Sequence, residues 1–174
     1  MDKVCQFYII LGNKEYQGKN DGNVYINDNH LISLKGPLKE VGGGFNCSHN
    51  LLTNLDGIPQ IDGDDFFCDH NQLVSLKGCP EGIEVFDCSH NNLTSLEGMP
   101  KRVRSVNCSH NNLTSLEGIP KRVKMDVNCS DNKLTSLEGA PESVGGYFTC
   151  SNNPTSFTED DVRAVCKVRT KINV

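Results

Sequence analysis

An asparagine returns at a nearly constant interval along most of the chain, and this period constrains the fold more than any single residue does. The series consists of Asn29, Asn50, Asn71, Asn91, Asn111, Asn132 and Asn153. Successive members are 21, 21, 20, 20, 21 and 21 residues apart. A fixed period of about 20 to 50 residues is typical of repeat architectures. The spacing therefore predicts a solenoid, in which each repeat packs mainly on its neighbours.

Each asparagine lies in a constant apolar frame. In the unit around Asn111, Val106 lies five residues before it, Cys108 lies three before it, and Leu113 and Leu116 follow it by two and five. A glycine and then a proline come next, and they turn the chain back without room for a full helix. One unit cannot bury its own apolar side, so we expect one short strand per repeat to stack on the next at about 4.8 Å.

This pattern resembles the leucine-rich repeat, LxxLxLxxNxL, with Val103, Val106, Cys108, Asn111 and Leu113 on its marked positions. The short period with proline in the return segment is similar to the bacterial subtype of secreted effectors from enteric pathogens. The sequence pattern CSxNxLTSLEGxP and the Val-Gly-Gly motifs at 41–43 and 144–146 are similar to those of repeat proteins encoded by tailed bacteriophages. The resemblance covers residues 20–157. It implies an α/β repeat fold, mostly β, that is a leucine-rich-repeat solenoid with one short parallel strand per repeat.

The ends of a solenoid expose their last rung and need caps. We expect an N-terminal cap over 1–20, seven leucine-rich repeats over 21–157 and a C-terminal helical cap over 158–174. Residues 4–17 read as a β-hairpin with its turn at Gly12-Asn13. At the other end, Thr158 with Asp161 predicts a capped helix start, and Val162, Val165, Cys166 and Arg169 follow at helical spacing. Two closed ends favour a complete protein.

A Cys-x-His pair recurs in four repeats, from Cys47 and His49 to Cys108 and His110, and it raises the question of a metal site. Ile26 replaces the cysteine in the first repeat, as an apolar slot permits, whereas Asp or Asn replaces the histidine elsewhere, as a solvated slot permits. Zinc needs ligands that converge tetrahedrally, and a column does not provide them. We therefore expect a core column of reduced thiols with the histidines outside, and Cys/His metal binding is the less favoured alternative.

Nothing singles out a catalytic residue. Ser, His and Asp are abundant and recur in several rungs, whereas catalysis needs one nucleophile with its own oriented base. We predict that the chain is not an enzyme and uses no cofactor or metal. Four aligned histidines would gather positive charge below a pH of about 6.5, so binding could depend on pH.

The concave strand face is where residues that break the repeat predict a partner site. From six to one residues before each asparagine there are six aspartates and no Lys or Arg, whereas the basic pairs 101–102 and 121–122 fall on the return side. Aromatic anchors on a solvated face are typical of interfaces, although isolated surface apolar residues are also ordinary. The predicted partner-binding residues are Tyr25, Asp65, Phe67, Asp69, Val85, Asp87, Asp126, Asp131, Tyr147, His49, His70, His90 and His110.

Charge and hydropathy limit the partners. With 17 Lys plus Arg against 22 Asp plus Glu, a net charge of −5 disfavours nucleic-acid binding. The longest apolar run, residues 7–11, is far shorter than the roughly 20 residues of a membrane span, and no signal-peptide pattern precedes it. We expect a cytoplasmic protein, free of membranes, that binds a protein with a basic surface.

The function predicted from these features is a non-enzymatic protein-binding leucine-rich-repeat module. The phage resemblance implies an inhibitor of a host protein, such as a defence component, that acts in the host bacterial cytoplasm. The alternatives are an effector-like adaptor, a structural or interaction protein of the virion and, less favoured, the metal binder. The sequence names neither the partner nor the oligomeric state.

Overall fold

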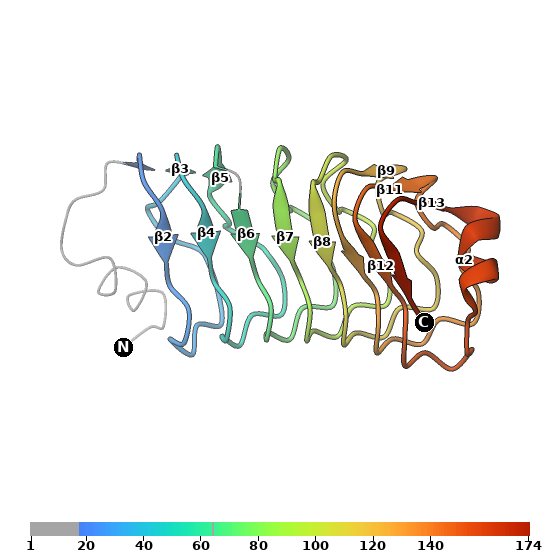
Figure 1. Cartoon of the computed structure of the whole chain (residues 1–174). Coiled ribbons are helices and arrows are strands. Elements are labelled where there is room, and N and C mark those ends of the chain that lie inside the picture. Colours follow the sequence, from blue (N-terminus) through green and yellow to red (C-terminus); the bar gives the residue numbers. More distant parts are fainter. Residues whose placement is uncertain (1–17, 64) are drawn as a thin grey trace.

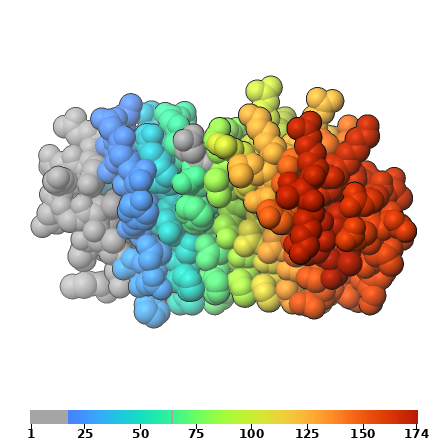
Figure 2. Space-filling model, viewed as in Figure 1, coloured from blue at the N-terminus to red at the C-terminus, as the bar shows by residue number. Residues whose placement is uncertain are grey.

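The computed structural model describes residues 18–63 and 65–174, which wind into a solenoid whose turns follow one another in a single row (Figure 1). The turns pack without a break into one elongated body (Figure 2). The predicted hairpin at 4–17 lies outside the described residues. No helix in the described part of the chain is long and apolar enough to cross a bilayer.

One parallel sheet of eight strands forms the main wall of the solenoid, in the order β14-β12-β10-β8-β7-β6-β4-β2. The strands are β2 (Val24–Tyr25), β4 (Phe45–Asn46), β6 (Asp65–Phe67), β7 (Val85–Asp87), β8 (Ser105–Asn107), β10 (Val127–Asn128), β12 (Tyr147–Thr149) and β14 (Lys171–Asn173). Each of the seven predicted repeats supplies one of the first seven strands, and every pair is parallel. The predicted solenoid with one short parallel strand per repeat is confirmed, and β14 adds a further rung.

A second set of strands lies where the chain approaches the main sheet, and it is interrupted in the middle. One small sheet contains β1 (Lys19–Asn20), β3 (Glu40–Val41) and β5 (Gln60–Ile61), and the other contains β9 (Arg122–Val123), β11 (Ser143–Val144) and β13 (Lys167–Val168). The approaches to β7 and β8 have no such strand. These two approaches belong to the 20-residue intervals, which have one or two residues fewer between the proline and the cysteine than the 21-residue intervals. The shorter segment is too short to form a strand of this second set before it enters the main sheet.

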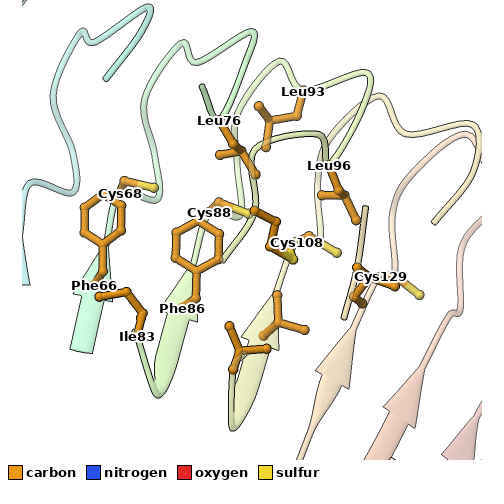
Figure 3. Close-up of a cluster of buried hydrophobic side chains, with 14 of the residues drawn as sticks. Phe66, Cys68, Leu76, Ile83, Phe86, Cys88, Leu93, Leu96, Cys108 and Cys129 are labelled. Atoms are coloured by element: carbon orange, nitrogen blue, oxygen red, sulfur yellow. The ribbon is translucent and has the colours of Figure 1, made fainter. Parts of the chain in front are cut away.

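The core is a stack of identical columns running along the solenoid. Phe45, Phe66 and Phe86 are fully buried, and their neighbouring ring centroids lie 6.2 and 5.5 Å apart. The Cys and Leu columns lie beside them, and Figure 3 shows Cys68, Cys88, Cys108 and Cys129 together with the leucines in the same interior. Each repeat thus buries its apolar side against the next one, which no single repeat could do alone.

The asparagine column ties the turns together from inside. In Asn111 the Nδ2 group donates to the carbonyl oxygens of Cys88 at 3.0 Å, Cys108 at 3.2 Å and Ser109 at 3.1 Å. Its Oδ1 accepts from the backbone N–H of Leu93 at 2.9 Å. The residue is 7% exposed, so its side chain satisfies buried backbone groups of two successive repeats.

The C-terminal segment differs from the predicted helix. Thr158 caps helix α2 (Glu159–Val165) in a capping box with Asp161, as predicted, but the helix ends after seven residues. Cys166 is extended, with φ −137° and ψ 131°, and the following residues form β13 and β14. These strands pair with β11 and β12, which supply the backbone hydrogen bonds that a longer helix would otherwise have to make internally. The segment after α2 therefore builds a rung rather than a continuous helix.

Candidate functional site

The strand face is the outward surface of the eight-stranded sheet, and its most irregular part lies on β6 and β7. In β6 and in β7 the middle side chain is buried and the two flanking ones are partly buried. The register places Asp65 beside Val85 and Phe67 beside Asp87. Four of the predicted partner-binding residues therefore form one contiguous patch, which we call the β6–β7 patch.

The last residue of four of the eight strands has a structural role that the sequence did not reveal. The side-chain Oδ1 atoms of Asn46 and Asp87 accept from the backbone N–H groups of Ser48 and Ser89, each at 2.9 Å. Asn107 and Asn128 do the same two residues on, at 3.2 and 3.1 Å. Asp and Asn commonly stabilise turns in this way. This column is therefore an acceptor column, and the polar residues in it serve the turn that ends each strand.

Phe67 replaces the acceptor of that column in the middle of the sheet. Its neighbours in the register are Asn46 on β4 and Asp87 on β7, and both make the turn hydrogen bond. A phenyl ring cannot accept this bond, and a partly buried phenyl ring contributes less burial than the core phenylalanines do. Phe67 therefore does not serve the turn as Asn46 and Asp87 do.

Tyr25 and Tyr147 lie away from the β6–β7 patch. Tyr25, 63% exposed, is on β2 with β4 between it and Phe67, whereas Tyr147, 47% exposed, is on β12 near the other end of the sheet. Asp126 accepts from the backbone N–H of Tyr147 at 2.8 Å, so this carboxylate also has a structural role. The predicted anchors thus form one central patch and two separate outlying tyrosines.

The charge of the strand face is acidic over its centre but not over its whole length. Asp69 accepts from Ser48 Oγ and lies 2.9 Å from His70 Nδ1, and Asp131 accepts from Asn152 Nδ2 at 3.1 Å. At the last strand, Lys171 is in register with Tyr147 and faces the same side. Our expectation that the face carries no Lys or Arg is wrong at this rung, because the sequence interpretation placed Lys171 in the helical cap.

The four histidines form a stacked column at the turn after the strands. Their ring centroids are 4.1, 4.1 and 4.0 Å apart, with interplanar angles of 13°, 18° and 14°. Each adopts a positive φ between 49° and 52°, and the Asp and Asn residues in the same slot do so as well. This left-handed conformation favours Asn, Asp and His among residues with a side chain. Partial burial, and then the two flanking imidazoles, lower the pKa of His90.

The cysteines and histidines of the Cys-x-His pairs point to different places. Cys108 is fully buried, burial raises its pKa to about 12, and its Sγ donates to the carbonyl of Asn128 at 3.4 Å. Burial likewise raises the pKa of the thiols at Cys68 and Cys88. Thiols that stay protonated inside the core are poor metal ligands, because the thiolate is the ligand form. The geometry therefore does not support the metal site that the pairs suggested.

One outer group has ligand atoms close together in the described residues: His49, Asp69 and His70, within 4.8 Å of one another. The two imidazoles stack face to face, so their nitrogen lone pairs, which lie in the ring planes, run side by side and do not converge. Asp69 is also already bonded to Ser48 and His70. This arrangement is better suited to a hydrogen-bonded turn than to a tetrahedral or octahedral ion site.

Comparison with known proteins supports the fold. No family model and no curated protein sequence matches the chain. Among solved structures, the leucine-rich-repeat domain of a Shigella effector is similar, with a TM-score of 0.51 and 16% sequence identity. The match covers 85% of this chain and 80% of the effector domain. The chain therefore has the architecture of a leucine-rich-repeat solenoid.

Proposed function

We propose that this chain is a non-enzymatic protein-binding module whose partner docks on the strand face over the β6–β7 patch. Phe67 is the observation that carries the proposal. It puts a partly exposed aromatic ring in a column where its neighbours Asn46 and Asp87 hold the turns. Aromatic side chains buried at the centre of an interface contribute most of the binding energy in many complexes. The loss of a turn acceptor at this rung is then explained by a gain on binding.

The charges around Phe67 indicate the kind of surface that fits. Asp65 and Asp87 flank it on the same patch, Asp69 follows two residues later, and no Lys or Arg lies on β6 or β7. A partner with Lys or Arg around an apolar pocket would complement this patch, and the attraction would speed association at low salt. The Ser and His residues nearby recur in neighbouring repeats, which supports binding rather than catalysis.

The similarity of the repeat sequence pattern to that of phage-encoded repeat proteins supports a more specific form of the proposal. In that form the protein acts in the cytoplasm of an infected bacterium and inhibits a host protein, such as a defence component. An adaptor role and a role in the virion would use the same strand face. Copurification with phage particles would identify the virion role, whereas capture of a host protein from lysate would identify the inhibitor or the adaptor.

The decisive variant is Phe67→Asn, because it removes the ring and restores the acceptor of the column. The restored turn hydrogen bond offsets part of the burial lost with the ring, so the fold should be retained. Capture of the partner from bacterial lysate, read by mass spectrometry, should be lost. Val74→Asn is the matched control: Val74 is 60% exposed but lies beyond the turn and outside the strand face. Capture by Phe67→Asn at the wild-type level would refute the proposal.

A further inference from the structure

A pocket of about 390 Å³ opens at the edge where the chain enters β7 and β8, away from the β6–β7 patch. It lies in the interruption between the two small sheets, where Figure 1 shows loops in place of the strands on either side. The 20-residue repeats lack the residue that would extend into such a strand, so no strand bridges the two small sheets here. We call it the break pocket.

The floor of the break pocket is apolar. Ile83 and Val103 line it, and they occupy the column that Val41, Ile61 and Val123 fill in the repeats with a second strand. Both are nearly buried, at 1% and 6% exposed, so the floor is firm core rather than a mobile loop. A volume of this size lies at the lower end of the range for ligand sites, which is about 300 to 1,000 Å³.

The walls of the break pocket are basic. Arg102, Arg104, Arg122 and Lys124 line it, and Glu84 is the one acid among the lining residues. Arg104 Nη1 lies 3.3 Å from Glu84 Oε2, and this ion pair accounts for that acid. In the described part of the chain, the other three basic side chains make no ion pair within 4.0 Å. A chain with a net charge of −5 thus concentrates three uncompensated positive charges around one apolar floor.

We propose that the break pocket binds an acidic peptide segment of a protein partner, with one apolar side chain on the floor and carboxylates paired with Arg102, Arg122 and Lys124. Arginine holds carboxylates in paired, charge-assisted hydrogen bonds. A simple inorganic anion would leave the floor of Ile83 and Val103 unused. A nucleic acid would need a long basic stripe, and this acidic chain offers one compact cluster. The site and its ligand are distinct from those of the strand face, so the two proposals stand or fall separately.

The test is an NMR titration of the ¹⁵N-labelled full chain with the peptide acetyl-Glu-Glu-Leu-Glu-Glu-amide. We expect saturable amide shifts at 82–84, 102–104 and 122–124. Replacing the peptide leucine by serine keeps the charge but removes the group for the floor, and it should weaken binding about fivefold or more. Equal binding of the two peptides, or identical shifts caused by inorganic phosphate alone, would overturn the proposal in favour of a simple anion site.

A pair of double variants separates the pocket from general electrostatic attraction. Arg122→Gln with Lys124→Gln removes two wall charges and should weaken peptide binding about tenfold, since charge-assisted pairs are among the stronger contacts. Lys101→Gln with Lys121→Gln removes the same charge from neighbouring positions outside the lining, and it should leave binding within about twofold. Unchanged circular dichroism verifies the fold of both. Equal losses in the two variants would show that the pocket has no specific role.

Discussion

Replacing Asn111 by leucine tests whether the asparagine column stabilises the stacking of the repeats. The Leu93 N–H loses its side-chain acceptor and becomes an unsatisfied buried donor, which costs about 1–3 kcal/mol. The carbonyls suffer less, because Cys88 also accepts from Asn91, and Cys108 also accepts from Asn132. The two lost N–H donors add about 1 kcal/mol each, and burial of the leucine returns about 1.5 kcal/mol. We expect a net loss of about 2–3 kcal/mol in the free energy of unfolding.

The assay is urea unfolding followed by far-ultraviolet circular dichroism, with Asn112→Leu as the control. Asn112 is the next residue and is partly exposed, and its side chain makes no hydrogen bond to any described residue. Its replacement should change the free energy of unfolding by no more than about 0.5 kcal/mol. If the two variants unfold at the same urea concentration, the column does not hold the turns together in the way that its hydrogen bonds indicate.

Two further predictions concern the turns. Because burial and the flanking imidazoles lower the pKa of His90, the unfolded chain binds a proton more readily, and stability should fall as the pH drops through about 6.5. His90→Asn should flatten the dependence of the urea midpoint between about pH 7.5 and pH 5.5, and an unchanged slope would contradict this. Gly118 has φ 99°, and an added Cβ would lie 2.6 Å from the Leu96 carbonyl, so Gly118→Ala should cost about 3 kcal/mol. Gly82, at φ 83° with open space around it, should lose only about 1 kcal/mol on the same change, and equal urea midpoints for the two alanine variants would refute the role of close packing.

The sequence predicted the main wall and the core of the solenoid because stacking gives each residue of a repeat the same environment as its equivalents. Substitutions between repeats therefore report burial: Ile26 in the cysteine slot indicated a core position, and Asp131 in the histidine slot indicated an exposed one. Both are confirmed, since Ile26 and the cysteine column are buried, and the histidines lie outside.

The features that depend on non-local pairing could not be predicted in this way. The change from 21 to 20 residues is visible in the sequence. Its result, the interruption between the two small sheets, depends on whether the equivalent segments of adjacent repeats pair as strands. Likewise, Val165, Cys166 and Arg169 have helical spacing, yet β13 and β14 form because β11 and β12 offer free partners. Pairing with an existing sheet therefore overrode a weak local pattern.

The candidate site shows a similar division between residues that serve the fold and residues that do not. Asp87 and Asp126 break the repeat in sequence, but the structure gives each of them a backbone N–H to hold. Phe67 also breaks the repeat, and the fold has no such use for it. Departure from a repeat is thus weak evidence of function by itself, and it becomes strong evidence when the structure supplies no compensating contact.

The same criterion applies to the break pocket and relates it to the strand face. The basic side chains of Arg122 and Lys124 line an opening where the second set of strands is interrupted. No acid among the described residues lies within ion-pair distance of them. The β6–β7 patch is acidic and the break pocket is basic, so one simple charged surface cannot satisfy both. If a single partner binds both sites, Phe67→Asn should weaken its capture, and so should Arg122→Gln with Lys124→Gln. If the partners are different, each variant will lose one protein and retain the other, and the two sets of captured proteins will distinguish these cases.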